Sequence, residues 1–211
     1  MGKTVIHANG SLKHQVVYAK ALAEGMGGEV SFSPYTEADI HVVIGPWFAL
    51  KPWRYAKTLY VDRAYWGDPD CVSIHWLKDG EKVRTKGRPY REHPKLHPMK
   101  PGSKTIYLCD YGGWPTGNFD SVRYHPAQRK PTTTLQYDLD AHQVAIGKRT
   151  TALVDAAIQG LRVETDDPHS PVYGITDREQ WARDLAWHNW SIDEIRSGEF
   201  LNGIGHYHAT Q

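Results

Sequence analysis

Short apolar segments alternate along the chain with stretches in which apolar residues recur every three or four positions. In the first half, Thr4–Ala8, Ala38–Gly45 and Thr58–Asp62 have the length and composition of buried strands. Between the first two, the apolar spacing predicts a helix that Ser11 caps and that the glycines from Gly25 onward end. This alternation is typical of an α/β fold with a largely parallel sheet.

The same alternation resumes in the second half. Thr105–Gly113, Ser121–Pro126 and Arg162–Thr165 are predicted strands, and a further helix and strand are expected within residues 134–147. The stretch Gly147–Leu161 is predicted to be a helix. At the end of the first half, Cys71–Leu77 alternates between apolar and polar residues, which predicts a strand at the edge of a sheet.

The tail predicts two amphipathic helices. Asp177 is the expected cap of the first, and Ser191 caps the second, with Glu194 at the capping-box position. We therefore expect two small α/β halves with a cleft between them, followed by carboxy-terminal helices. The expected boundaries are 1–77 for the first half, 78–104 for a linker, 105–176 for the second half and 177–211 for the helices and tail.

The predicted linker is rich in proline and in basic residues. It has four prolines and nine basic residues against three acidic ones. It is either a solvated connection or a surface that contacts a polyanion. The candidate nucleic-acid contacts are Arg84, Lys86, Arg88 and Arg91.

Composition narrows the class of protein. The chain has 211 residues and a formal charge of +1, which argues against a highly basic coat protein for nucleic acid. Cys71 and Cys109 are its only cysteines, too few for a disulfide framework, and a reducing cytoplasm fits. The sequence shows no signal peptide or membrane span. It predicts a soluble, cytoplasmic protein without a metal site, a membrane contact or an obligate protein partner.

The start of the predicted helix at Gly147 carries unusual residues. Lys148 and Arg149 lie where the helix dipole favours acids, and Thr150 and Thr151 follow them. A bound phosphate would accept hydrogen bonds from free backbone N–H groups and both hydroxyls, and would neutralise the two cations. The alternative is a simple Thr150 N-cap with two solvated side chains.

Other candidate groups lie after neighbouring predicted strands. Ligands of open α/β sheets bind at the carboxyl ends of strands. The side chains expected to gather there are Arg123, His125, Arg129, Lys130, Lys148, Arg149, Thr150 and Thr151. An imidazole such as that of His125 can donate to a diphosphate leaving group.

The stretch from Val122 to Pro171 resembles the nucleotide-sugar-binding half of GT-B glycosyltransferases, in particular bacterial sialyltransferase-like and capsule-polysaccharide enzymes. The matching positions are His125 with Pro126, Thr150 with Thr151, and the small-residue helix with Asp155. The resemblance covers about a quarter of the chain. It implies two Rossmann-like halves, a nucleotide sugar as co-substrate, no other cofactor, and a metal-independent transfer. The donor-binding residues that follow are Arg123, Lys148, Arg149, Thr150, Thr151 and Asp155.

Leu59–Asp70 resembles segments of small proteins of tailed phages, which favours a hydroxymethylated pyrimidine in phage DNA as acceptor. Asp62 is then the candidate general base, facing the cleft, unless it pairs with Arg63 or shapes a turn. Trp47, Trp53 and Trp66 could support an extruded base. Three alternatives remain: a cell-surface polysaccharide acceptor, a sugar-nucleotide epimerase on the same scaffold, and a non-catalytic phage protein that binds a nucleotide or nucleic acid.

Overall fold

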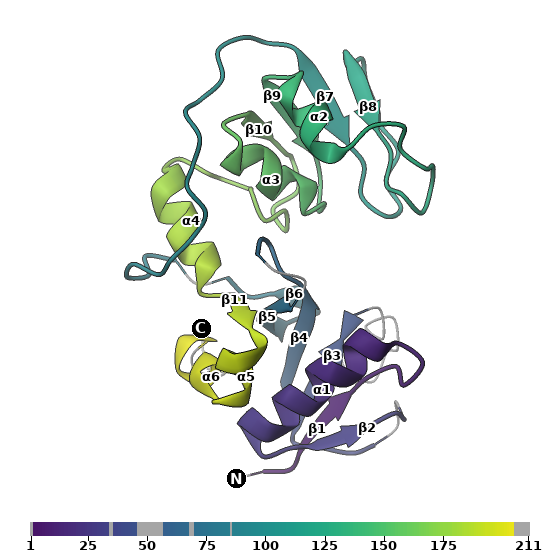
Figure 1. Ribbon diagram of the computed structural model, residues 1–211, viewed down its shortest axis with the longest axis vertical. Helices are drawn as coiled ribbons and strands as arrows, with labels where there is room; N and C mark the ends of the chain where they lie inside the picture. The colour runs from purple at the N-terminus through teal and green to yellow at the C-terminus, as the bar shows by residue number, and fades with distance from the viewer. Residues whose placement is uncertain (1, 34–35, 46–56, 68–69, 85, 205–211) are drawn as a thin grey trace. The chain divides into compact units, whose positions relative to one another are not determined.

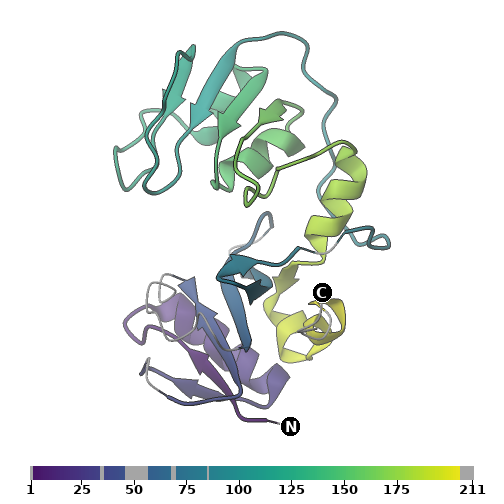
Figure 2. The same cartoon turned by 180° about the vertical axis from the view of Figure 1, so that it is seen from behind.

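A computed structural model describes residues 2–33, 36–45, 57–67, 70–84 and 86–204. The chain divides into two compact units: unit 1 contains Met1–Glu92 and Arg183–Gln211, and unit 2 contains His93–Ala182. The chain thus leaves the first unit and returns to it. Each unit is built on its own β-sheet (Figures 1 and 2).

The sheet of unit 1 contains the strands predicted for the first half. β1 (Thr4–His7) pairs in parallel with β2 (Glu29–Ser31) and with β3 (Ile40–Ile44), and β3 pairs in parallel with β4 (Lys57–Arg63). β5 (Cys71–Lys78) runs antiparallel to β4. The sequence predicted four of these five strands, all except β2, and the α/β class is confirmed.

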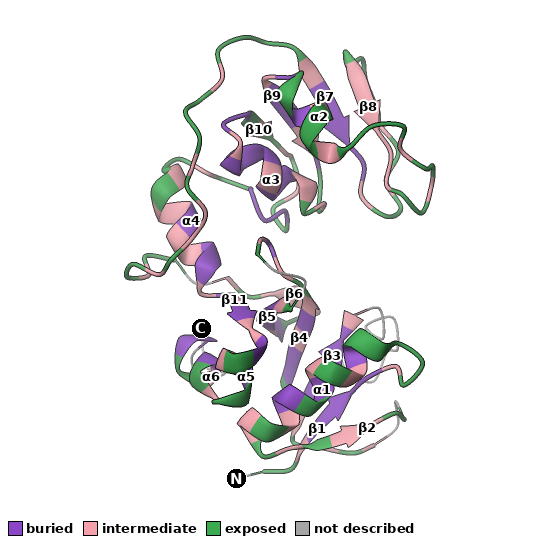
Figure 3. Cartoon of the chain, in the orientation of Figure 1, coloured by how far each residue is buried: buried purple, intermediate pink, exposed green. Residues whose placement is uncertain are grey.

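The edge position predicted for β5 is wrong. β11 (Asn189–Ser191) pairs antiparallel with β5 on the side away from β4, and the two-residue strand β6 (Glu81–Lys82) also pairs with it. Val72, Ser73, Ile74 and His75 are all buried, so the alternating sequence does not reflect one solvent-facing side (Figure 3).

α1 (Lys13–Met26) covers this sheet with its buried face. Its end agrees with the sequence, because Gly27 adopts a left-handed conformation with φ of 67° and its N–H donates to the Ala23 carbonyl. Its predicted cap is wrong. The N-cap residue is Leu12, without a side-chain bond, because the Asn9 side chain accepts from the Ser11 N–H and draws that residue into the preceding turn.

The returning chain completes the core of unit 1. α4 (Arg178–Ala186) contains the boundary between the units, and α5 (Ile192–Arg196) and α6 (Glu199–Ile204) follow β11. Trp190, Ile195 and Phe200 are fully buried in the same cluster as Ile6 and Leu59. The predicted caps are confirmed: Asp177 accepts from the N–H groups of residues 179 and 180, and Ser191 and Glu194 form a capping box.

Unit 2 contains a four-stranded parallel sheet. Its strands are β7 (Thr105–Leu108), β8 (Ser121–Arg123), β9 (Val144–Gly147) and β10 (Arg162–Glu164), in the order β10-β9-β7-β8. α2 (Leu135–Asp140) precedes β9, and α3 (Ala152–Ile158) follows it. Because all strands are parallel, their carboxyl ends lie along one edge of the sheet, called here the carboxyl edge.

The segment 78–104, expected as a linker or exposed loop, is attached to folded structure on both sides of residue 92. The N–H groups of Gly87 and Arg88 donate to Asp184 within unit 1. In unit 2, the N–H of His97 donates to the Ile158 carbonyl and that of Lys100 to the Gly160 carbonyl. These bonds satisfy backbone groups that a solvated loop would leave to water.

Candidate functional site at the carboxyl edge of unit 2

The strand register of unit 2 places the ends of all four strands in one row. Leu108 of β7 is aligned with Arg123 of β8 and with Gly147 of β9, and the register of β9 with β10 continues the row at residue 165. β7 is central, and the chain moves to β8 on one side before returning to β9 on the other. Ligands of open parallel sheets bind where the strand order reverses in this way.

Gly147 allows the ends of β7 and β9 to approach closely. A Cβ atom at this position would lie 2.6 Å from the backbone oxygen of Leu108, too close for any side chain. The glycine at the end of β9 therefore brings the loop that begins at Lys148 close to the end of β7.

The loops after β7 and β8 form one surface. The rings of Tyr111 and His125 lie 5.4 Å apart, edge to face, and those of Trp114 and Tyr124 lie 5.7 Å apart in the same manner. The Gln128 side chain donates to the Gly113 carbonyl at 3.0 Å. Tyr111 and Trp114 are exposed over 76% and 67% of their areas, so much of this aromatic surface is open to a ligand.

The backbone fixes the tautomer of His125. The N–H of Ala127 donates to His125 Nδ1 at 3.2 Å, so Nδ1 is an acceptor and carries no proton. In the neutral ring the proton is therefore on Nε2, which has no hydrogen-bond partner among the described residues. The half-buried ring thus presents an N–H donor beside Tyr111.

A cavity of about 320 Å³ lies against β8. Its walls include the cations Arg123, Arg129 and Lys130, the hydroxyl of Thr132, and one carboxylate, Asp138. Arg123 already has partners within unit 2, because its guanidinium forms an ion pair with Asp138 and donates to the Thr133 carbonyl at 3.1 Å. Arg129 and Lys130 are exposed, which leaves a net positive wall for an anion.

The loop after β9 differs from the predicted helix start. α3 begins at Ala152 and not at Gly147. The N–H of Ala152 donates to Thr150 Oγ1, that of Leu153 to the Thr150 carbonyl, and that of Val154 to the Thr151 carbonyl. The first turn therefore binds its own N–H groups and offers none of these three to a phosphate. The N-cap residue is Thr151, without a side-chain cap bond, and not Thr150 as in the alternative.

The side chains of this loop have different environments. Lys148 is exposed and has no ion-pair partner among the residues that the structure describes. Arg149 Nε donates to Asp167 Oδ2 at 2.7 Å, which ties the loops after β9 and β10 together. This bond, with the Arg149 charge and the His169 N–H, lowers the pKa of Asp167 against the opposing effect of desolvation, which is the largest single contribution.

Asp155 lies within α3, and its carboxylate has no hydrogen-bond or ion-pair partner within the described ranges. Desolvation raises its pKa to about 6. The pKa of Asp120 and that of Asp167 are lowered, so Asp155 is the one of these three carboxylic acids of unit 2 whose pKa lies closest to neutral pH. Its position on the helix was predicted, but no sequence pattern indicated that its pKa would be raised.

The structure does not leave Asp62 free to act as a base. Its carboxylate accepts from Lys82 Nζ at 3.3 Å, from the Arg63 backbone N–H at 2.8 Å and from the Tyr60 hydroxyl at 3.4 Å. Burial lowers the pKa of Lys82, while the charge of Asp62 opposes that shift. The alternative that Asp62 is a paired, structural acid therefore has the better support, with Lys82 as the partner.

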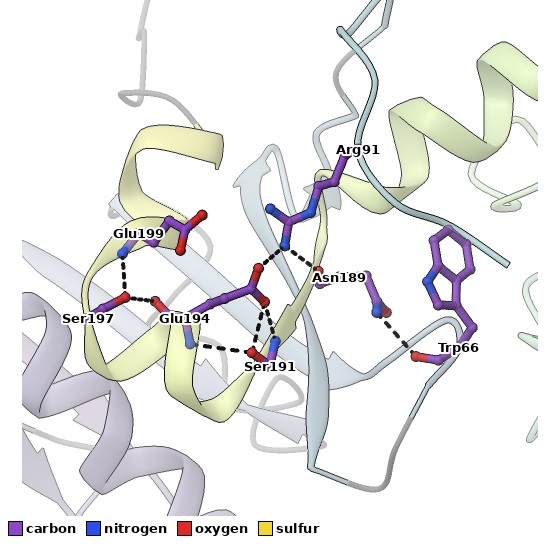
Figure 4. A network of polar contacts seen from close by, with 7 residues as sticks. All are labelled: Trp66, Arg91, Asn189, Ser191, Glu194, Ser197 and Glu199. Carbon is purple, nitrogen blue, oxygen red and sulfur yellow. Dashed lines mark hydrogen bonds and ion pairs between the residues drawn. The ribbon is translucent and has the colours of Figure 1, made fainter.

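Two of the four predicted nucleic-acid contacts are engaged within unit 1. Arg88 donates to the Gly203 carbonyl and lies over the Trp187 ring. Arg91 forms an ion pair with Glu194 at 2.6 Å (Figure 4). The Cζ atom of Arg91 also lies 3.7 Å from the centroid of the Trp190 ring. Arg84 is half-buried and Lys86 is exposed, so Lys86 is the most accessible cation of the four.

Comparison with known proteins found no matching family model, no matching curated protein and no matching solved structure. Within the described residues, no helix has the length and apolar character to cross a membrane. No group of three or more His, Cys, Asp or Glu residues in the described ranges is arranged to hold a metal ion. The function is therefore argued from the carboxyl edge itself. Trp47 and Trp53 lie outside the described residues.

Proposed function

We propose that unit 2 binds the phosphates of a nucleotide sugar at its carboxyl edge and that the chain is a metal-independent glycosyltransferase. The observation that carries this proposal is the fixed Nε2–H donor of His125. A neutral imidazole that donates from a known atom can stabilise the charge that develops on a leaving diphosphate. Two Rossmann-like halves of the GT-B type are part of the proposal.

The surroundings of His125 support a phosphorylated ligand. Arg129 and Lys130 line the cavity against β8, which Tyr124 also lines, and Lys148 begins the loop after β9, on the other side of the central strand β7. The exposed rings of Tyr111 and Trp114 offer faces on which a base or sugar can stack. Cations, hydroxyls and aromatic faces together match the three parts of a nucleotide sugar.

The transfer balances without a redox partner. The bond between the anomeric carbon and the phosphate oxygen breaks, and the nucleotide leaves with that electron pair. The acceptor hydroxyl forms the new bond to the anomeric carbon and releases its proton to solvent. His125 Nε2–H donates a hydrogen bond to the departing phosphate, and the cations neutralise part of its charge.

The test is turnover with a defined panel. We would incubate the protein with UDP-glucose, GDP-mannose and CMP-N-acetylneuraminate, each with hydroxymethylcytosine-containing DNA, unmodified DNA or an oligosaccharide, and measure products by mass spectrometry. A mass gain of one sugar on an acceptor supports the proposal and identifies the acceptor class. A changed sugar nucleotide without an acceptor product would indicate an epimerase.

A second candidate function is a non-catalytic module that binds a nucleotide. The engagement of Asp62 by Lys82, Tyr60 and the Arg63 N–H favours it, because the carboxylate expected to act as the base is already paired. Both functions predict that the double variant Lys148→Ala, Arg149→Ala weakens nucleotide binding by more than about tenfold, or 1.4 kcal/mol. Only the transferase predicts a glycosylated product.

A further inference from the structure

Unit 1 contains a second cavity, of about 530 Å³, that the proposed function does not use. α1 contributes His14 and Tyr18 to its walls, and the chain after β4 contributes Arg63 and Trp66. The cavity therefore lies at the carboxyl end of β4. Its volume is within the range of small-molecule sites, about 300–1,000 Å³.

Aromatic side chains from two separate elements line this cavity. The rings of His14 and Tyr18 contact each other edge to face at 5.9 Å on α1, and Trp66 belongs to the loop between β4 and β5. Rings on different elements present faces and edges against which a flat heterocycle can stack.

The loop that carries Trp66 is held in place by the returning chain. The Tyr65 N–H donates to Asn189 Oδ1 at 2.8 Å, and Asn189 Nδ2 donates to the Trp66 carbonyl at 3.2 Å. The same residue accepts from Arg91 through its own carbonyl (Figure 4). The Tyr65 side chain is buried, and its hydroxyl forms a hydrogen bond with His75. Tyr65 and the backbone of Trp66 are therefore both held in place.

Two donors at the cavity have no partner within the described ranges of the chain. The indole N–H of half-buried Trp66 makes no hydrogen bond, and the guanidinium of Arg63 forms no ion pair or hydrogen bond, among the residues that the structure describes. Asp70 supplies a carboxylate at the same cavity. Burial and the Asp70 charge raise the pKa of Tyr18, so its hydroxyl also remains protonated at neutral pH.

We propose that this cavity binds a nucleobase, as part of a nucleoside or a nucleotide, with its ring against Trp66 and Tyr18. The edge of a nucleobase displays hydrogen-bond acceptors, which suit the N–H donors of Trp66 and Arg63. Three aromatic rings against a single carboxylate favour a flat aromatic ligand over a saccharide, whose hydroxyls need more acceptors. The site lies in unit 1 and goes beyond the phosphate site of unit 2.

The test uses probes without phosphate, so that the site of unit 2 contributes little. We would titrate the full chain with thymidine, cytidine, adenosine and guanosine by calorimetry and follow the indole N–H signals by NMR. At least one nucleoside should bind and shift the Trp66 signal. Trp66→Ala should weaken that binding by about tenfold or more, because stacking on an aromatic ring is lost, while Trp66→Phe should retain most of it.

Matched variants separate this proposal from the proposed function. Arg63→Ala, at an exposed side chain, should weaken nucleoside binding several-fold, whereas Tyr173→Ala, at an exposed aromatic side chain of unit 2, should leave it unchanged. Asn189→Ala should weaken it by releasing the Trp66 loop. The proposal is wrong if no nucleoside shifts the Trp66 signal, if Trp66→Ala binds as tightly as the parent chain, or if methyl glucoside binds better than every nucleoside. A failed sugar-transfer assay would leave these results unaffected.

Discussion

The imidazole of His188 stacks on that of His75, with ring centroids 4.2 Å apart and an interplanar angle of 13°. The contact joins the segment before β11 to β5, two parts of the chain that are far apart in sequence. His188 Nδ1 donates to the Ile74 carbonyl, and the Tyr65 hydroxyl bonds His75 Nε2. Two neutral rings can share this buried site, whereas two imidazolium ions cannot.

This pair predicts that unit 1 loses stability in mild acid. Desolvation by burial is the main cause that lowers the pKa of His188 to about 4 and the pKa of His75 well below 6.5. Each of these histidines is protonated below about pH 6.5 in the unfolded chain but stays neutral to a lower pH in the folded chain. The free energy of unfolding is therefore highest above pH 6.5 and falls as the pH decreases towards 4. The loss can reach about 3 kcal/mol for one such histidine.

The measurement is urea unfolding between pH 7.5 and 4.5. His188→Asn keeps a donor to the Ile74 carbonyl and removes the titration, so its stability should depend less on pH than that of the parent chain. His14→Asn, at an exposed site, should leave the pH dependence unchanged. Equal pH slopes for the parent chain and His188→Asn would contradict this account. His7, whose pKa burial also lowers to about 4, should retain part of the slope in both.

A second prediction concerns the contact between β7 and β9. Gly147→Ala should destabilise unit 2 by about 1–3 kcal/mol, because the added Cβ meets the Leu108 carbonyl oxygen and the two strands must separate. Gly112→Ala is the matched control, since a Cβ there meets nothing within 4 Å. Urea unfolding followed through the amide signals of β7 and β9 measures both. A stability for Gly147→Ala equal to that of the control would refute the close approach.

A third prediction separates structural from accessible cations in the basic segment. Arg91→Ala removes a half-buried ion pair with Glu194 and the contact with the Trp190 ring, and should cost about 1–3 kcal/mol of unfolding free energy. Lys86→Ala should change it by less than about 0.5 kcal/mol, as is usual for an exposed side chain. Thermal unfolding of the two variants decides this, and similar losses for both would be inconsistent with the structure.

Structural features that depend on residues close in sequence were predicted, whereas features that depend on residues far apart in sequence were not. The capping box at Ser191 and the glycine stop of α1 depend on residues within one turn, and both were predicted. The position of β5 depends on β11, more than a hundred residues later, and no local pattern signals that pairing. The roles of Arg88 and Arg91 likewise depend on Trp187, Trp190 and Glu194, so a basic segment that reads as a polyanion surface is partly packed against the returning chain.

The candidate site shows the same division. The parallel sheet and the strand ends that carry His125 and Lys148 follow from the alternation of strands and helices. The short α3, its satisfied N–H groups and the pairing of Asp62 with Lys82 depend on distances that periodicity does not contain. The exposed rings of Tyr111 and Trp114 were missed as ligand surfaces, although their place directly after a strand was a usable signal.

A fourth prediction tests the donor atom of His125. His125→Asn keeps an acceptor for the Ala127 N–H but removes the Nε2–H donor. It should weaken the binding of a nucleoside diphosphate by about tenfold, because a hydrogen bond to a charged group is lost. His125→Gln places an amide N–H near the position of Nε2 and should retain most of the affinity. Calorimetry with UDP and GDP measures both variants. If they weaken equally, the role assigned to Nε2–H is lost.

The most direct test of the central claim is to map nucleotide-sugar binding on the full chain by NMR. In titrations with UDP-glucose, GDP-mannose and CMP-N-acetylneuraminate, we expect at least one ligand to shift the amide signals of the loops after β7, β8 and β9, with Tyr111, His125 and Lys148 among the largest changes. If no ligand shifts these signals, or if the shifts fall on other parts of unit 2, the carboxyl edge is not a phosphate site and the transferase proposal fails with it.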